Sequence, residues 1–296
     1  MKTRNIIGAI LLLAVLLASC KKDASQNPAT EKQNNLAVSK SLSSLSLNHV
    51  KKKLSKGLVA WYPFCGDAND MSGNGNNGTL VGYFDPGTGL PGNLPVLTTG
   101  KHGRPNSAYS FDGATSYIST GSFFTDSVSE FSFYVRFKSG SAGDLLGTGD
   151  FYFSQPASYL SVGPDNSVFF SWQNFDTQIY DVVNSSVHSG PVTVKPNAWV
   201  DVVVTFKNSV LTIYINGKME ASATAALPVG DLGAGGTIGA ARFRYPNGFL
   251  LGTIDEVRVY DKPLNHDEIE NLYHHNKHHE HEGHDWHDER EGHDRD

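Results

Sequence analysis

Cysteine is nearly absent from this sequence. Two of its 296 residues are cysteines, Cys20 and Cys65, and Cys20 closes an N-terminal segment that reads as a signal. Cys65 is then the single cysteine left in the rest of the chain, which excludes an intramolecular disulfide framework. A folded domain in this chain must therefore be stabilised by its hydrophobic core.

The central part of the chain also lacks positive charge. The formal net charge of -6 divides into +2 for residues 1–20, +6 for 21–56, -9 for 57–273 and -5 for 274–296. An acidic domain has no excess of cations to neutralise phosphates, so nucleic acid is excluded as a partner. Residues 21–56 are rich in Ser, Asn, Gln and Lys and poor in aromatics, which predicts a flexible tether.

Long apolar runs are missing apart from one near the N-terminus. This run extends from Ile6 to Leu17 and is too short to cross a bilayer comfortably. Lys2 and Arg4 precede it and small residues follow it. This arrangement predicts a secretory signal peptide over residues 1–20.

The end of the signal carries a more specific pattern. Leu17-Ala18-Ser19-Cys20 resembles the bacterial lipobox, and Lys21-Lys22-Asp23 resembles the start of many Bacteroidetes lipoproteins. The resemblance implies a lipid on Cys20 and a protein anchored to the outer membrane or cell surface. The alternative is an ordinary cleaved signal in which the cysteine is incidental.

From Gly57 onward, short β-branched and aromatic runs alternate with turn residues, which indicates an all-β domain. Trp61, Tyr62 and Trp199 lie in predicted strands and are expected in the core. Asn208-Ser209 and Asn216-Gly217 predict tight hairpin turns, and Asp112-Gly113 predicts another turn. The strands are expected at residues 57–64, 107–111, 130–138, 144–146, 151–154, 159–162, 167–172, 199–207, 210–215 and 252–260.

Five segments match one family in order and spacing. They are Val59–Phe64, Asp70–Gly78, Ala108–Gly113 with Tyr117-Ile118, Leu211–Gly217, and Gly252–Tyr260 leading into Asn265–Tyr273. Together they resemble the laminin G-like jelly-roll domains of bacterial secreted proteins. The resemblance implies a concanavalin A-like sandwich of two antiparallel sheets over residues 57–273, with a short C-terminal helix. Asn265 and Glu268 have the spacing of a capping box for that helix.

The loop over residues 65–78 is the candidate calcium site. It places Asp67, Asn69, Asp70 and Asn74 among glycines, and Ca²⁺ prefers such hard oxygen ligands. The family resemblance implies a calcium site near this loop, to which Asp255 of the closing strand would contribute. The alternative is that the Asn and Asp residues only form turns.

A second candidate surface combines aromatic and amide side chains. Tyr159, Trp172, Phe175 and Tyr180 occur among Gln and Asn residues, a composition suited to a groove for glycans or peptides. Packing in the core explains about half of the aromatics in this region equally well, because strand residues alternate between faces.

No catalytic constellation is visible in the sequence. Asp255 and Glu256 are adjacent, so they are expected on opposite faces of a strand and not as a same-face acid pair.

Residues 274–296 contain eight His and eight acidic residues. If the preceding helix continued, His274, His278 and His281 would share a face, which predicts weak binding of Zn²⁺ or Ni²⁺. The alternative is a solvated tail with no metal role.

The sequence therefore predicts a surface-anchored, non-catalytic module that recognises a glycan or an extracellular protein and is stabilised by Ca²⁺. Two alternatives remain. One is a non-catalytic accessory protein of polysaccharide capture, and the other is a metal-scavenging lipoprotein that acts through its His-rich tail.

Overall fold

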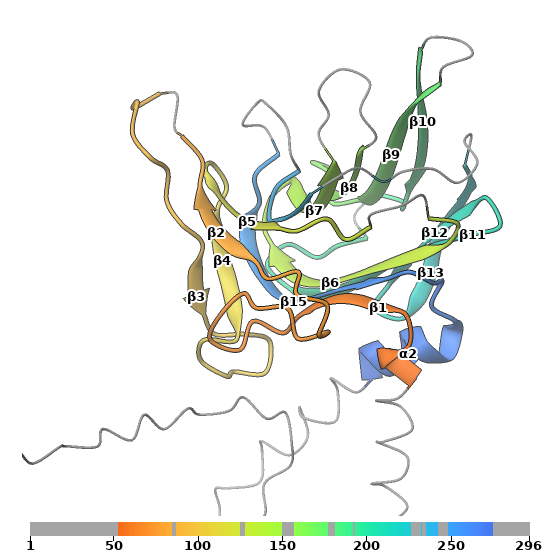
Figure 1. The fold of residues 1–296 in the computed structure, drawn as a ribbon, viewed down its shortest axis with the longest axis horizontal. Coiled ribbons are helices and arrows are strands. Elements are labelled where there is room, and N and C mark those ends of the chain that lie inside the picture. Colours follow the sequence, from red (N-terminus) through yellow and green to blue (C-terminus); the bar gives the residue numbers. More distant parts are fainter. Residues whose placement is uncertain are drawn as a thin grey trace, which may run out of the picture. The chain divides into compact units, whose positions relative to one another are not determined.

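A computed structural model describes residues 53–84, 87–124, 128–149, 157–176, 181–191, 193–225, 232, 235–241 and 248–274, without the side chains of 173–176 and 181–184. These ranges form two antiparallel sheets packed face to face, with a helix against one of them (Figure 1). This architecture confirms the predicted two-sheet jelly-roll sandwich. The predicted strand at 151–154 lies outside the described residues.

The first sheet, sheet A, contains eight strands. They are β1 (Leu58–Tyr62), β3 (Val96–Thr98), β4 (Ala108–Asp112), β6 (Phe131–Ser139), β11 (Trp199–Lys207), β12 (Val210–Ile215), β13 (Lys218–Thr224) and β15 (Leu251–Tyr260). Their order is β13-β12-β11-β6-β15-β4-β3, and β1 pairs with the C-terminal part of β15.

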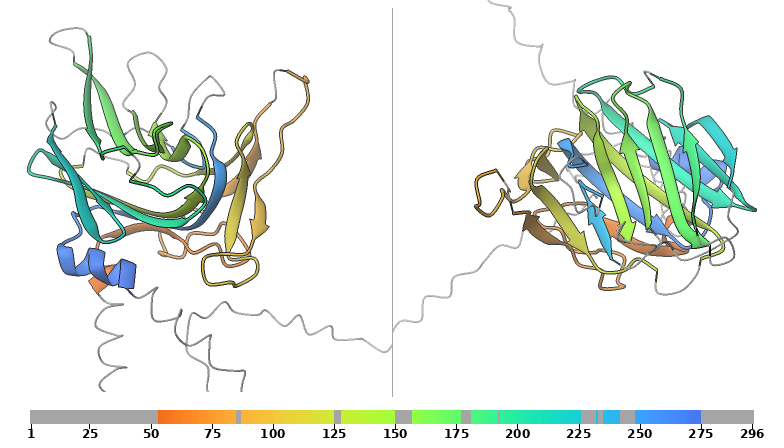
Figure 2. Two further views of the ribbon diagram at one scale, coloured as in Figure 1. Left: turned by 180° about the vertical axis from the view of Figure 1, so that it is seen from behind. Right: turned by 90° about the horizontal axis from the view of Figure 1, so that it is seen from above.

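The second sheet, sheet B, contains seven strands. They are β2 (Thr79–Gly82), β5 (Ser116–Thr120), β7 (Gly143–Gly149), β8 (Ala157–Val162), β9 (Val168–Asp176), β10 (Asp181–His188) and β14 (Gly236–Ile238). Their order is β10-β9-β8-β7-β14-β5-β2, and Figure 2 (right) shows the sheet from above.

The core lies between the sheets. Alternate residues of β6 point inward, and so do those of β9 and β11, because side chains along a strand alternate between faces. The inward set is Phe131, Phe133, Val135, Phe137, Val168, Phe170, Trp172, Val200, Val202, Val204 and Phe206. Full burial of each large apolar side chain contributes roughly 1.5–3 kcal/mol, so this layer supplies the stability that disulfides do not.

A smaller apolar cluster covers part of the outer face of sheet A. It consists of Leu54, Tyr134, Val203, Tyr260, Leu264, Ile269 and Leu272. The last two come from helix α2 (His266–His274), which begins with the predicted capping box. The Glu268 N–H donates to Asn265 Oδ1 at 3.0 Å, and the Asn265 N–H donates to Glu268 Oε2 at 2.9 Å.

The predicted turns are confirmed. Asn216 and Gly217 have φ values of 51° and 82°, and Asn208 and Ser209 have 49° and 62°. Positive φ at both central residues is the geometry of a two-residue hairpin turn.

The prediction of core positions is wrong for two of the three aromatic residues. Tyr62 is buried, but Trp61 and Trp199 are half-buried and lie on the outer face of sheet A.

Candidate functional site

Three aromatic rings lie on neighbouring strands of sheet B, on the face directed away from the core. Phe169 of β9 stacks on His188 of β10 with ring centroids 5.1 Å apart and an interplanar angle of 14°. Tyr159 of β8 meets the edge of Phe169 at 5.7 Å and 89°. Tyr159 and Phe169 are half-buried and His188 is exposed. We call these three residues the first platform.

The register of the strands explains this grouping. Phe169 pairs with His188 on one side, and Tyr159 pairs with Ser171. Residues 168, 170 and 172 fill the core, so residues 169 and 171 must face outward. Ser171 and Ser186 are paired neighbours on the same outer face and add hydroxyl groups beside the rings.

A buried carboxylate, that of Asp144, lies beside the first platform on the same face of sheet B. Ser161 pairs with Phe169 and also with Asp144 of β7, and its hydroxyl donates to Asp144 Oδ1. The Ala241 N–H donates to Asp144 Oδ2 at 3.2 Å. Burial raises the pKa of Asp144 to about 6, although the hydrogen bonds from Ser161 and Ala241 oppose the rise. At neutral pH this group carries a costly buried charge.

The structure places the four predicted ligand-binding aromatic residues in different environments. Tyr159 belongs to the first platform, and ligand binding by its side chain stays a prediction. Trp172 as a ligand-binding residue is wrong, because its side chain is fully buried against Phe131 and Phe206. Phe175 lies in β9, but its side chain lies outside the described residues, as does all of Tyr180.

Sequence reasoning missed Phe169 and His188. The run Val168-Phe169-Phe170-Ser171-Trp172 is apolar at four of its five positions. The even-numbered and the odd-numbered residues of this strand therefore look equally suited to the core. The polar Ser171 was the available signal, because it places the odd-numbered residues of this strand on the outer face.

The loop over residues 65–78 uses its polar side chains to hold its own backbone. Asp70 is buried, and its two carboxylate oxygens accept from the N–H groups of Trp61, Ser72 and Asn76 and from the Ser72 hydroxyl, at 2.8–3.0 Å. The Asn69 side-chain amide donates to Asp67 at 2.7 Å. These contacts favour the turn alternative, and Ca²⁺ binding by the loop stays a prediction.

The side-chain amide of Asn74 is also committed to the backbone. It donates to the carbonyl oxygens of Leu58 and Val59 at 3.0 and 2.9 Å. The other predicted ligand, Asp255, accepts the N–H of Lys101 at 2.7 Å and lies 3.8 Å from the Arg136 guanidinium. Within the described ranges, no three His, Cys, Asp or Glu side chains gather where they could hold one metal ion.

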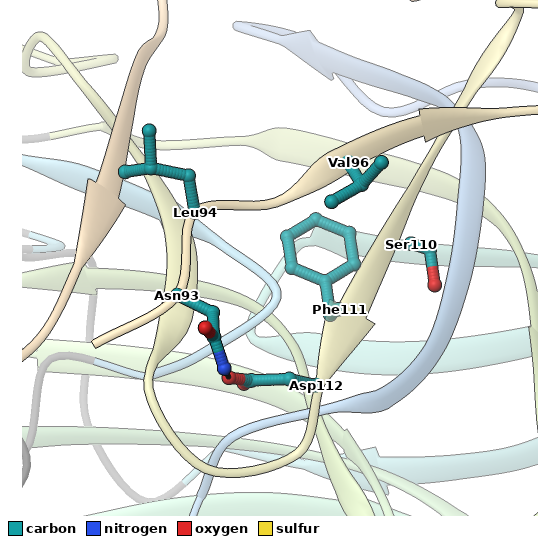
Figure 3. Close-up of a pocket in the computed structure, with 6 residues that line it drawn as sticks. All are labelled: Asn93, Leu94, Val96, Ser110, Phe111 and Asp112. Carbon is teal, nitrogen blue, oxygen red and sulfur yellow. Dashed lines mark hydrogen bonds between the residues drawn. The ribbon is translucent and has the colours of Figure 1, made fainter.

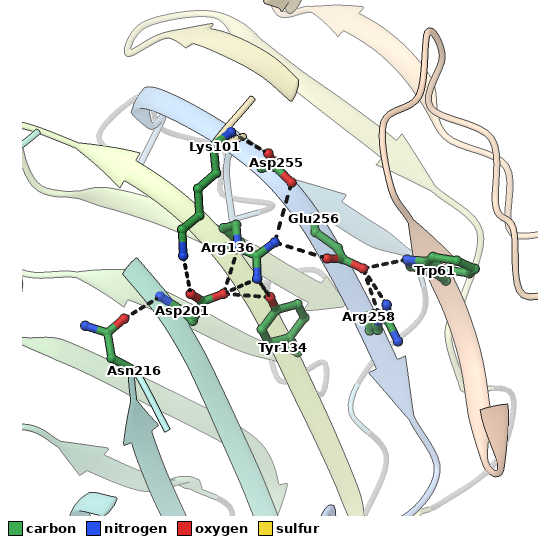
Figure 4. A network of polar contacts seen from close by, with 9 residues as sticks. All are labelled: Trp61, Lys101, Tyr134, Arg136, Asp201, Asn216, Asp255, Glu256 and Arg258. Carbon is green, nitrogen blue, oxygen red and sulfur yellow. Dashed lines mark hydrogen bonds and ion pairs between the residues drawn. The ribbon is translucent and has the colours of Figure 1, made fainter. Parts of the chain in front are cut away.

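Arg136 is the centre of a buried polar network on the outer face of sheet A (Figure 4). Its Nη2 lies 2.7 Å from Asp201 Oδ1, and its Nη1 lies 3.5 Å from Glu256 Oε2. Lys101 Nζ is 3.3 Å from Asp201, and Arg258 Nη2 is 2.6 Å from Glu256. The network, with Asp255, contains three cations and three carboxylates, so its charges balance.

The expected separation of Asp255 and Glu256 is wrong. A β-bulge interrupts β15 between Ile254 and Glu256, so simple alternation fails there and both carboxylates approach Arg136. They are 3% and 1% exposed. A glycosidase needs its acid pair open to the sugar, so this pair is placed to hold the sheet together and not to reach a glycosidic bond.

The comparison with protein families decides the classification. A family model described as "Concanavalin A-like lectin/glucanases superfamily" matches residues 112–270. The chain belongs to this superfamily. Among curated proteins, no sequence is significantly similar to it.

Solved structures agree with this superfamily fold. Domain 4 of AbnA, a GH43 extracellular arabinanase from Geobacillus stearothermophilus, in complex with arabinotriose, is 20% identical with a TM-score of 0.54, covering 73% of this chain and 98% of that one. The botulinum neurotoxin serotype G binding domain is 15% identical with a TM-score of 0.55, covering 74% and 51%. The serotype D ligand binding domain in complex with N-acetylneuraminic acid is 14% identical with a TM-score of 0.51, covering 75% and 51%. This chain thus spans about half of the toxin chains.

One further feature of this superfamily member lies away from the first platform. A shallow pocket of about 430 Å³ is lined by Asn93, Leu94, Val96, Ser110, Phe111 and Asp112 (Figure 3). Its carboxylate is not free for a ligand, because Asp112 accepts from the N–H groups of Ala114, Thr115 and Ser116. Burial alone would raise the pKa of Asp112, but these hydrogen bonds outweigh it and hold the pKa well below its usual range.

The predicted tail and anchor residues are mostly outside the described ranges. His274 ends α2, and its Nε2 lies 3.7 Å from Glu270 one turn earlier. His278, His281 and Cys20 lie outside the described residues, so metal binding by the tail and lipidation stay predictions. In the part of the chain that the structure describes, no helix combines the length and hydrophobicity that crossing a bilayer requires.

Proposed function

We propose that the domain binds glycans on the first platform, and that a lipid on Cys20 holds it at the bacterial surface. The observation that carries the proposal is the row of Tyr159, Phe169 and His188 on the outer face of sheet B. Aromatic faces carry partial negative charge and attract the weakly positive C–H groups of a sugar ring. Three adjoining rings on neighbouring strands form an apolar surface against which the C–H groups of a sugar ring can pack.

Polar groups around the rings support the same ligand class. Ser171 and Ser186 lie on the adjoining row, and Tyr159 adds a phenol. These groups can donate and accept hydrogen bonds, as sugar hydroxyls require. In small-molecule sites, aromatic rings usually supply the contact area, and a few polar groups fix the orientation of the ligand.

The comparisons support the proposal at the level of the fold. Two of the similar structures are complexes with arabinotriose and N-acetylneuraminic acid, which are sugars. A non-catalytic accessory role in polysaccharide capture is the variant of this function that fits an anchored glycan binder. An extracellular protein is the alternative ligand.

The test is a glycan array with the mature protein, followed by titration of each hit. Phe169→Ala and Tyr159→Ala should each weaken binding by about tenfold or more, because central aromatic anchors contribute at least ~1.4 kcal/mol. Trp199→Ala is the matched control, since Trp199 lies on the outer face of sheet A. Hits whose affinity survives both platform substitutions would contradict the proposal, and so would an array with no hits.

Binding of Zn²⁺ or Ni²⁺ by the tail is proposed as a second function, because residues 274–296 contain eight His and eight acidic residues. Imidazole and carboxylate groups are the ligands that these ions take in proteins.

A further inference from the structure

Sheet B carries a second group of aromatic rings. Phe249 lies 6.0 Å from Tyr83 and 6.3 Å from Tyr117, measured between ring centroids. All three side chains are half-buried. We call them the second platform, and none of them was singled out as a ligand-binding residue from the sequence.

The second platform faces the same way as the first. Tyr117 lies in β5 next to Ile118, which is buried in the core, so Tyr117 points to the outer face. Val81 pairs with Tyr117, and Tyr83 continues the same alternation two residues after Val81. The two platforms are therefore separate parts of one face and not opposite sides of the sandwich.

The strand order sets the distance between them. From β8, which carries Tyr159, to β5, which carries Tyr117, the order is β8-β7-β14-β5. Three strand spacings of about 4.8 Å separate these strands by about 14 Å. Phe169 lies one strand further away, in β9.

Small residues occupy the described positions between the platforms. They include Gly147, Thr237, Ala240 and Ala241, and a Cβ added to Gly147 would lie 2.9 Å from the Cα of Ala241. The backbone at Ala240 and Ala241 therefore passes directly over β7 with short side chains. At these four residues the face between the platforms carries only short side chains.

The charged groups on this face are few. Among the described side chains that face outward from sheet B or border the first platform, Asp144 and Asp165 are acidic and none is a Lys or Arg. The hydroxyl and N–H of Ser167, followed by the nearby His188, hold the pKa of Asp165 below its usual range. These two carboxylates would repel an anionic group placed beside them.

From this arrangement we infer that both platforms bind the same ligand chain, and that the ligand class is a linear polysaccharide longer than about 15 Å. The inference rests on the proposed glycan-binding function. A chain held on the first platform presents its next units to the second at high effective concentration. Avidity of this kind increases affinity by about 100-fold or more without new types of contact.

The experiment is calorimetric titration of the mature protein with arabino-, xylo- and cello-oligosaccharides from disaccharides upward, and with the parent polysaccharides. For the series that binds, affinity should rise by about 100-fold once the chain exceeds about 15 Å. Tyr117→Ala and Tyr83→Ala should remove this step and leave disaccharide affinity unchanged. Phe169→Ala should weaken binding at every length, and Trp199→Ala should change none of it.

The outcomes separate the two proposals. Equal affinity for short and long chains, with Phe169→Ala still disruptive, would overturn the second platform and keep the first. The same holds if Tyr83→Ala, checked by an unchanged melting temperature, retains the full gain for long chains. Absence of any sugar binding by the unmodified protein would overturn both.

Discussion

Replacing Asp144 by Asn should stabilise the domain at mildly alkaline pH and leave it almost unchanged in acid. Asp144 is buried in β7, and burial raises its pKa from the ordinary value of 3.8 to about 6. Ionising this carboxyl in the folded state is therefore harder than in the unfolded state by about two pKa units. At 1.36 kcal/mol per unit, the cost is about 3 kcal/mol.

The sign of the pH dependence follows from the direction of the shift. Below about pH 4 the carboxyl is protonated in both states, and its stabilising contribution is fully present. As the pH rises through about 6, the folded carboxyl ionises and that contribution is lost. The stability gained by Asp144→Asn should therefore grow from near zero at about pH 4 to about 3 kcal/mol at about pH 8.

Asparagine suits the site sterically as well. Its amide can donate to the Ser161 hydroxyl, and its oxygen can accept the Ala241 N–H that Asp144 now accepts. Urea denaturation across this pH range measures the difference directly. For a domain of this size, 3 kcal/mol corresponds to a rise of roughly 6–12 °C in the melting temperature.

Asp165→Asn is the matched control with the opposite sign. Hydrogen bonds from Ser167 hold the pKa of Asp165 below its usual range, so its contribution is present at neutral pH and is lost as the pH falls. The control should therefore destabilise the domain more at about pH 8 than at about pH 4. If Asp144→Asn gains the same stability at both pH values, or loses stability at the higher one, the assignment of a costly buried charge is refuted.

Four further predictions concern other parts of the chain. Arg136→Met should lower the free energy of unfolding by about 3–5 kcal/mol, because it leaves buried carboxylates without their cation, and an unchanged urea midpoint would contradict this. Ca²⁺ at 100 times its dissociation constant should add about 2.7 kcal/mol to the tail-less domain, and Asp67→Ala should remove the gain. Equal melting in Ca²⁺ and in chelator would show that the loop is only a turn. Cys20→Ala should release the protein from membrane fractions, whereas continued partitioning into detergent would exclude the lipid anchor. Deleting the residues after His274 should remove most Zn²⁺ and Ni²⁺ binding in calorimetric titration, and equal uptake by both proteins would eliminate the tail as a metal site.

Local signals in the sequence were enough for much of the fold. The hairpin at Asn216-Gly217 and the capping box of Asn265 and Glu268 depend on residues within one turn of each other, so they can be read without tertiary contacts. Strands β2, β3, β5, β10, β13 and β14 were not predicted. Of these, β2, β3 and β14 contain three or four residues each and are stabilised by neighbours distant in the chain, which leaves little periodicity to detect.

The candidate site was harder to predict for a different reason. Trp172 and Phe169 are both aromatic residues of one strand, and only the register decides which of them fills the core. The bulge in β15 likewise depends on its pairing with β6, and it brings Asp255 and Glu256 to one guanidinium. In both cases the sequence supplies the residue types, whereas the face on which each residue lies is set by long-range pairing.

The place where the described residues begin has a mechanical consequence. Leu54, at the start of the described chain, packs with α2 on the outer face of sheet A, and the two platforms lie on the opposite side of the sandwich. In a protein anchored through its N-terminus, a pulling force on a bound polysaccharide would act on sheet B and would be transmitted to the anchor through β1. That strand is fastened by its pairing with β15, by the Trp61 indole N–H that donates to Glu256 at 2.8 Å, and by Arg258 stacked 4.7 Å from the Trp61 ring. In such a protein the force would pass through the buried ionic network, which would connect the N-terminal anchor to a glycan bound on sheet B.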